Sequence, residues 1–312
     1  MGHRFKTYAL HGLNIRSEIP LDEDESPAAS PDLDVRRGPA GPLAAAKGRL
    51  IAEFTLFGRT WYRAYEHGDD YLLRFPKLAD FVVSADLRQV QTRPESETDE
   101  EAISLLLVGT TVAFVLALRG HCVLHAGAVA IDGRAVALAG LAGTGKSTCT
   151  ALLCAQGAAL VADDVLRVEL GDVPTAIRGA SSIRLRPRAA SLIELFAETP
   201  PSRHTYDQRL AIYPPRGELT LPLAAVVLPR PNREIDQVQL VQIAGAEALT
   251  SLISSARFTG WSNHDRQRRQ FEQLANLARS IPVYRAQVPW REPMSASVGE
   301  ELLDVLAREI TR

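Results

Sequence analysis

Residues 135–157 read Ala135-Val-Ala-Leu-Ala-Gly-Leu-Ala-Gly-Thr-Gly-Lys-Ser147-Thr-Cys-Thr-Ala-Leu-Leu-Cys-Ala-Gln-Gly157, and this stretch decides the fold. Its centre, Gly140 to Ser147, matches the phosphate-loop pattern G-x-x-x-x-G-K-S/T. Apolar residues before the loop predict a strand, and Ser147 to Gln156 after it predict a helix that Gly157 stops as a C-terminal cap. A chance glycine-rich turn would lack this context, so we interpret the stretch as a strand, a phosphate loop and a helix.

The residue types of the loop predict how it would bind a nucleoside triphosphate. Glycines at three positions allow positive φ, so that backbone N–H groups can approach an anion closely. Lys146 would supply positive charge for the β- and γ-phosphates of ATP, and the Ser147 hydroxyl would hold Mg²⁺. The residues expected to contact the nucleotide are Gly140, Leu141, Ala142, Gly143, Thr144, Gly145, Lys146, Ser147 and Thr148.

A pair of carboxylates follows the next apolar strand pattern, at Asp163 and Asp164. Beside a phosphate loop, one such carboxylate can hold Mg²⁺ while the other accepts the proton of an attacking hydroxyl. Two like charges this close also raise the pKa of one partner. We expect Asp163 to be the base and Asp164 to share the metal with Ser147. The alternative is a solvated turn that only ends the strand.

The strand before the phosphate loop is predicted to be the second arm of a hairpin. Cys122 to Ile131 has a strand pattern, and Asp132-Gly133 separates it from the next apolar run, a strong signal for a tight turn. His125 lies on the first arm, where the hairpin would bring it near the terminal phosphates of a nucleotide. A histidine in a strand can equally be a packed core residue.

Together, Leu124-His-Ala-Gly127, the loop and Val161-Ala-Asp-Asp164 resemble the catalytic core of the bacterial HPr kinase/phosphorylases. That core is similar to the one in phosphoenolpyruvate carboxykinases, and the resemblance covers roughly residues 118–230. It implies an α/β fold with an antiparallel hairpin before the phosphate loop, and a mainly β N-terminal region. It also implies that His125 steers the γ-phosphate or the acceptor and that Arg178 stabilises the transferring group.

The N-terminal residues 8–20 resemble the opening of a shorter branch of that family. Members of the branch are found beside lasso-peptide biosynthesis genes and phosphorylate a serine of the precursor peptide. One departure from the family concerns Ala176-Ile-Arg-Gly179, because HPr kinases have a metal-binding glutamate at the first of these positions. Alanine cannot bind metal, so we expect a kinase without the reverse, phosphate-dependent reaction.

Composition limits the other possibilities. The chain has 312 residues, 46% hydrophobic and 23% charged, with a net charge of −2, so it has no overall field that would attract nucleic acid. A local basic patch is expected from Arg184, Arg186 and Arg188, extended by Arg203 and His204, although a solvated strand edge would have the same composition. Its three cysteines fit neither a zinc motif nor a disulfide framework, and we expect a reducing cytoplasm.

We expect a boundary near residue 100, with a mainly β region at 1–100 and the kinase domain with its C-terminal helices at 101–312. Strand candidates in the first region are 49–57 and 71–75, and most of 21–43 is expected to be loop. The apolar run 103–118 is shorter than a membrane span and is expected to be a buried helix on the kinase sheet. No signal peptide is expected at the start.

The function that these observations favour is an ATP- and Mg²⁺-dependent serine kinase acting on a peptide or protein. We also expect a homo-oligomer, with no nucleic-acid partner and no membrane span. Two alternatives are a nucleotide-binding regulatory or assembly protein without transfer activity, and a kinase of a small molecule.

Overall fold

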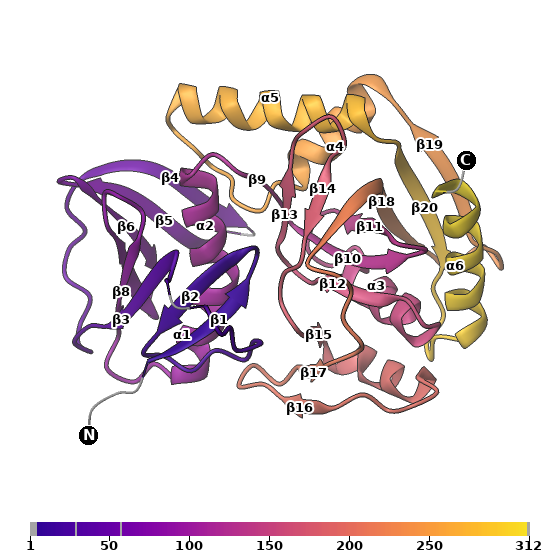
Figure 1. Cartoon of the computed structure of the whole chain (residues 1–312), viewed down its shortest axis with the longest axis horizontal. Helices are drawn as coiled ribbons and strands as arrows, with labels where there is room; N and C mark the ends of the chain where they lie inside the picture. Colours follow the sequence, from indigo (N-terminus) through magenta and orange to yellow (C-terminus); the bar gives the residue numbers. More distant parts are fainter. Residues whose placement is uncertain (1–4, 29, 57, 311–312) are drawn as a thin grey trace. The chain divides into compact units, whose positions relative to one another are not determined.

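The computed structural model describes residues 5–28, 30–56 and 58–310. It has a mixed α/β fold with three sheets. The chain divides into two compact units (Figure 1). Unit 1 comprises residues 1–121 and 258–270, and unit 2 comprises residues 122–257 and 271–312.

Unit 1 is built on an eight-stranded sheet with the order β1-β2-β3-β8-β7-β6-β5-β4. Buried and more accessible side chains alternate in β1 and β2, which is the pattern of strands with one buried face, whereas β3 and β7 each have a run of three buried residues. One strand, β3, lies inside the 21–43 segment that was expected to be mostly loop. The strands are β1 Lys6–Leu10, β2 Leu13–Ser17, β3 Leu33–Arg37, β4 Arg49–Leu56, β5 Arg59–His67, β6 Asp70–Phe75, β7 Ala79–Val83 and β8 Gln89–Pro94.

The apolar helix, which was expected on the kinase sheet, belongs to unit 1, so the division differs from the expected boundary near residue 100. It runs through α1 Glu100–Leu106, a π-helical turn η1 Leu107–Thr111 and α2 Val112–Leu118. The helix belongs to unit 1 because the ring of Phe114 contacts the rings of Tyr71, Phe258 and Trp261. These partners come from β6 and from the returning segment 258–270.

Length and composition would let this helical run of 19 residues cross a membrane, and it is the one such segment within the described ranges. Its most apolar window is 61% buried inside the protein, as in a core helix. Asp99 caps its N-terminus by accepting a hydrogen bond from the Glu101 amide at 2.7 Å.

Unit 2 contains a nine-stranded sheet in which the phosphate-loop strand β11 has an antiparallel and a parallel neighbour. β10 pairs antiparallel with β11 through the turn at Asp132 and Gly133, and β18 runs parallel to β11 on its other side. The strands are β9 Cys122–Leu124, β10 Ala126–Ile131, β11 Arg134–Ala139, β12 Ala159–Ala162, β13 Leu166–Glu169, β14 Thr175–Ile177, β18 Thr220–Asn232, β19 Gln239–Ile243 and β20 Val283–Pro289.

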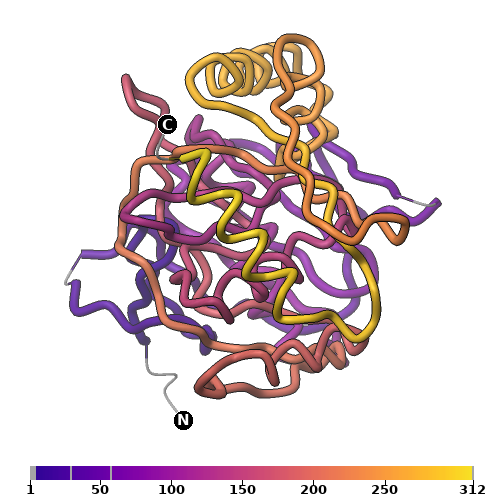
Figure 2. The backbone as a smooth tube through the Cα atoms, turned by 90° about the vertical axis from the view of Figure 1, so that its right-hand side faces the viewer, coloured from indigo at the N-terminus to yellow at the C-terminus, as the bar shows by residue number. Residues whose placement is uncertain are grey.

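Helices cover this sheet and enclose its apolar core. α3 Lys146–Ala155 follows the phosphate loop, and α6 Ala296–Ile310 packs against α3 and β20; the tube in Figure 2 shows α6 in yellow across the near side. α4 Gly245–Ser254 belongs to unit 2, whereas α5 His264–Ser280 begins in unit 1 and ends in unit 2. Leu152, Leu302 and Leu306 lie in one core cluster between these elements.

A small third sheet completes unit 2. It has the order β15-β17-β16, with β15 Ile183–Leu185, β16 Ser202–His204 and β17 Leu210–Ile212. The 3₁₀ helix η2, Pro187–Leu195, follows β15 and packs against α3.

The contact between β10 and α3 leaves no room for a side chain at Gly127. A Cβ there would lie 2.2 Å from Thr150 Oγ1, and Thr150 is fully buried and donates to the Lys146 carbonyl at 2.9 Å. Gly127→Ala should therefore push α3 away and lower the free energy of unfolding by about 1–3 kcal/mol, measured by urea denaturation. Gly171→Ala is the control, because its Cβ would have no neighbour closer than 4.0 Å. Equal stability of the two variants would contradict this packing.

Candidate functional site

The phosphate loop joins β11 to α3 and has the backbone that its glycines predict. Gly140, Gly143 and Gly145 all have positive φ, at +139°, +87° and +90°. Gly145 caps α3, and a Cβ at this position would come within 2.7 Å of the Trp290 ring. The loop is thus held against an aromatic side chain that follows β20, and larger residues at Gly145 are excluded by both its φ and this contact.

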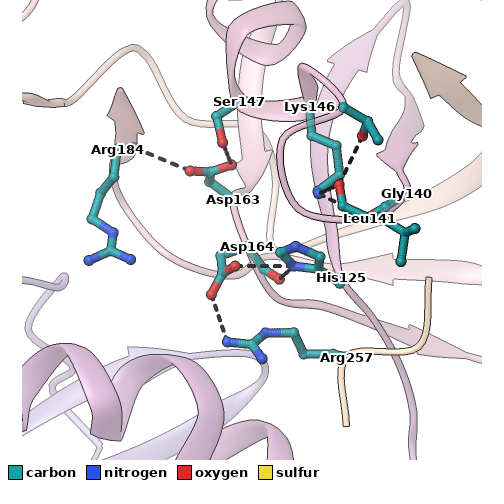
Figure 3. A network of polar contacts seen from close by, with 10 residues as sticks. His125, Gly140, Leu141, Lys146, Ser147, Asp163, Asp164, Arg184 and Arg257 are labelled. Atoms are coloured by element: carbon teal, nitrogen blue, oxygen red, sulfur yellow. Dashed lines mark hydrogen bonds and ion pairs between the residues drawn. The ribbon is translucent and has the colours of Figure 1, made fainter. Parts of the chain in front are cut away.

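Lys146 is turned back onto its own loop. Its Nζ donates hydrogen bonds of 2.9 Å to the carbonyls of Gly140 and Leu141 (Figure 3). The side chain is buried, and burial lowers the pKa of Lys146 to about 8, against the opposing charges of Asp163 and Asp164. The same ammonium would be available to a phosphate if it left these carbonyls.

Asp163 and Asp164 follow β12 and point in different directions, because the backbone between them turns sharply. Asp164 has φ of +67°, and the Val165 amide donates to the Asp163 carbonyl at 2.8 Å. An i+2 to i hydrogen bond around a residue with this φ is a γ-turn of the rare, strained kind. The turn separates two carboxylates that neighbour each other in the chain.

The first carboxylate, Asp163, is oriented toward the loop. It is 5% exposed and accepts a hydrogen bond from the Ser147 hydroxyl at 3.0 Å and one from the Arg184 amide at 3.2 Å (Figure 3). Burial raises the pKa of Asp163, and the charge of Asp164 adds to this shift. The contact seen at Ser147 is therefore with Asp163, whereas we had expected Ser147 to be grouped with Asp164.

The second carboxylate, Asp164, is oriented toward His125 and Arg257 and is 34% exposed. His125 Nδ1 lies 3.1 Å from both the backbone carbonyl and Oδ1 of Asp164, and Arg257 donates to Oδ2 at 2.8 Å. Burial acts to raise the pKa of Asp164, but Arg257 and His125 hold it well below its usual range. Because a carbonyl oxygen only accepts, His125 must carry its proton on Nδ1.

Arg257 was not found by the sequence analysis, since it lies 93 residues after Asp164 and belongs to no motif. It reaches the site because the chain after α4 runs beside β9. The His125 amide donates to the Ser255 carbonyl at 2.7 Å, and the Arg257 amide donates to the Val123 carbonyl at 2.9 Å. These two bonds flank an isolated bridge between Leu124 and Ala256, and this bridge brings Arg257 to the site.

Arg178, by comparison, donates to the carbonyl of Gly217 at 3.2 Å, just beyond β14.

Ala176, the position of the missing carboxylate, is fully buried opposite Val168 and Leu221, so a carboxylate would not fit there. Glu169 is a carboxylate that could replace the missing one, but it is paired with Arg167 and lies at the end of β13 that is far from the aspartates. Four residues of strand β13, with a rise of about 3.3 Å each, carry the chain away from the aspartates to Glu169.

The side chains of the site supply only some of the oxygen ligands that a hard divalent cation needs. The oxygens of Ser147 and Asp163 converge and are donors that Mg²⁺ prefers, but phosphate oxygens and water would have to complete its coordination. Over the described ranges there is no group of three His, Cys, Asp or Glu residues that could bind a metal alone. This donor set suits a metal that arrives with a nucleotide.

Comparison with known proteins gives little beyond the structure. No family model matches the chain, and no curated protein sequence does. Among solved structures, the HPr(Ser) kinase/phosphatase from Coxiella burnetii matches with 12% sequence identity and a TM-score of 0.33, over 60% of this chain and 94% of that one. A likeness of this extent carries no argument about function, which must rest on the residues of the site.

The γ-turn at Asp164 makes a prediction about stability. Alanine and glycine both remove the carboxylate, but only glycine accepts positive φ without strain. We therefore expect Asp164→Gly to be about 1 kcal/mol more stable than Asp164→Ala in urea denaturation. At ordinary strand positions the order is the reverse, so an alanine variant that is the more stable of the two would exclude the strained turn.

Proposed function

We propose that the protein transfers the γ-phosphoryl group of ATP to a serine hydroxyl of a peptide or protein. The observation that carries the proposal is the convergence of the phosphate loop with a divided carboxylate pair. Ser147 contacts the buried Asp163, while Asp164 is turned outward. A site that only binds nucleotide has no need of the second, partly exposed carboxylate and its two partners.

The loop and Lys146 would bind the triphosphate. Backbone amides of the loop, which has positive φ at its glycines, would point at the β- and γ-phosphates. Lys146 would exchange the carbonyls of Gly140 and Leu141 for phosphate oxygens. Positioning and charge neutralisation supply most of the catalysis in phosphoryl transfer, so these contacts account for a large share of the expected rate.

The geometry supports roles for the two aspartates opposite to those suggested by the sequence, with Asp163 as the metal ligand and Asp164 as the base. Asp163 and Ser147 would hold Mg²⁺, which neutralises charge on the phosphates. Asp164 is the carboxylate that an acceptor hydroxyl can reach, because its side chain is 34% exposed and Asp163 is nearly enclosed. A low pKa does not exclude Asp164 as the base, since proton transfer is late when the transition state is loose.

His125 and Arg257 would position Asp164 and add positive charge beside the transferring group. Both contact its carboxylate, at 3.1 and 2.8 Å. With Nδ1 donating to Asp164, the Nε2 atom of His125 is left for a phosphate or acceptor. We keep Arg178 as a candidate for stabilising the transferring group, although Arg257 has the closer contact with the aspartate pair.

We propose that transfer runs in one direction. A reverse reaction with inorganic phosphate needs an additional anion beside the metal and a well-charged site to hold it. Ala176 is in the apolar core and Glu169 is at the far end of β13, so neither adds a carboxylate beside Asp163. The precursor of a lasso peptide is the specific acceptor that the N-terminal resemblance suggests.

Incubation with γ-labelled ATP separates the proposed kinase from its alternatives. Label in a peptide or protein supports a serine kinase, and label in a small metabolite supports a small-molecule kinase. If the protein binds the nucleotide but labels no acceptor, the result would support a regulatory or assembly protein without transfer activity. Acid-stable label identified as phosphoserine is the expected result.

The lowered pKa of Lys146 leads us to expect that ATP binding is coupled to protonation of this side chain. With a pKa of about 8 in the free protein, Lys146 is mostly neutral at pH 8.5, and bound phosphates would restore its charge. Calorimetric titration with Mg-ATP at pH 8.5, in buffers of different ionisation enthalpy, should show uptake of roughly 0.5–0.8 proton per site. At pH 6.5 the uptake assigned to Lys146 should vanish, because the lysine is already charged. Binding with equal proton uptake at both pH values would exclude this role.

The divided aspartates predict two different kinetic defects. Asp164→Asn should bind Mg-ATP normally and lose transfer by about 10²–10⁴-fold, because a base acts only in the chemical step. Asp163→Asn should instead raise the Mg²⁺ concentration required for half-maximal activity. Initial rates over a Mg²⁺ series distinguish the two, with Glu169→Gln as a control of unchanged activity. The reverse pattern would return the roles to Asp163 as base and Asp164 as metal ligand.

A further inference from the structure

Two arginines lie beside the aspartate pair, Arg184 in β15 and Arg186 directly after this strand. Ile183 and Leu185 are buried in the core, so the intervening Arg184 points to the opposite face. Arg186 continues the extended backbone, with φ of −67° and ψ of 156°, and therefore shares the face of Arg184. Arg184 is half-buried and Arg186 is exposed.

A third arginine joins them across the sheet. Arg184 pairs with Ala211 of β17, and Ala211 pairs in turn with Arg203 of β16. Directly opposite residues share a face, so Arg184 and Arg203 flank Ala211 on the same side. Two strand spacings separate their backbones by about 10 Å. We call Arg184, Arg186 and Arg203 the arginine row.

The row begins at the candidate site. The Arg184 amide donates to Asp163, and Figure 3 shows the Arg184 side chain extending alongside the aspartate pair. At its other end, the guanidinium of Arg203 is oriented by the hydroxyl of Tyr213, which accepts from Nε at 3.1 Å. A guanidinium held in this way loses less freedom when it binds a carboxylate.

Arg203 lies too far along the sheet to serve the transferring phosphoryl group. Arg184 already occupies the position beside the aspartates, and Arg203 is two strands beyond it. About 10 Å corresponds to three residues of an extended peptide. A positive charge at this distance from the transferring group is suited to a residue of the acceptor that flanks its serine.

We propose that the arginine row binds an acidic acceptor segment, with Arg203 taking a carboxylate about three residues from the phosphorylated serine. The proposal rests on the proposed kinase function and adds the chemical class of its acceptor. A carboxylate side chain matches the planar guanidinium with two parallel hydrogen bonds. Peptides without acidic residues would be poorer acceptors because they would lack this charge-assisted contact.

The test compares two pairs of serine peptides. Within each pair the peptides differ only in having Glu or Gln three residues from the serine, before it in one pair and after it in the other. The wild-type protein should have a KM about tenfold lower for one of the Glu peptides. Arg203→Gln should abolish that ratio while the KM for ATP stays unchanged, and Arg203→Lys should retain part of it. Arg188→Gln is the matched control, because Arg188 is exposed beyond Pro187, outside the row.

The outcomes distinguish this inference from the kinase proposal itself. Equal phosphorylation of the Glu and Gln peptides would refute the acidic acceptor and leave the kinase intact. If no peptide is phosphorylated, the kinase proposal and this inference both fail. A second arm measures binding of a dye-labelled Glu peptide in Mg-ADP by fluorescence anisotropy, where loss in Arg203→Gln but not in Arg188→Gln supports the row. Equal loss in both variants would indicate a general charge effect and refute it.

Discussion

The constraint on which the rest of the site depends is the γ-turn at Asp164. Two consecutive aspartates would point to opposite faces of a regular strand, with neither aimed at a shared reaction centre. Here positive φ at Asp164 and the bond from the Val165 amide to the Asp163 carbonyl make a tight kink between β12 and β13. One carboxylate thereby reaches the serine of the loop, and the other reaches His125 and Arg257. Such a conformation costs of order 1–3 kcal/mol, which the surrounding structure must supply.

Several neighbouring contacts hold this turn in place. His125 donates to the Asp164 carbonyl, and β13, which begins two residues later, is paired with β9 and β14. β12, which ends just before the turn, is paired with β10. Both ends of the turn are therefore tied to the sheet that carries the phosphate loop. The opposite environments of the two carboxylates follow: Asp163 is enclosed and its pKa is raised, while Asp164 is ion-paired and its pKa is lowered.

Features encoded by neighbouring residues could be predicted from the sequence, and features made by distant residues could not. The loop glycines, the helix that stops before Gly157 and the strand that stops before Asp163 depend on local residue types. Arg257 depends on a bridge between β9 and a segment more than 130 residues away, and no motif records it. The apolar helix was assigned to the wrong sheet because hydrophobicity predicts burial but not the partner, which here is the aromatic cluster around Phe114. Ala176 could be recognised as lacking a carboxylate, but its burial could not.

The most direct test of the account is a crystal structure of the protein with Mg²⁺ and a non-hydrolysable ATP analogue. We expect Lys146 to leave the carbonyls of Gly140 and Leu141 for the β- and γ-phosphates. We also expect Ser147 and Asp163 to lie on the metal side, and the γ-phosphate to lie between the loop and Asp164. A nucleotide bound away from the loop, or a metal on Asp164 with Asp163 open to the acceptor side, would contradict the central claim that the γ-turn divides the two aspartates between metal and acceptor.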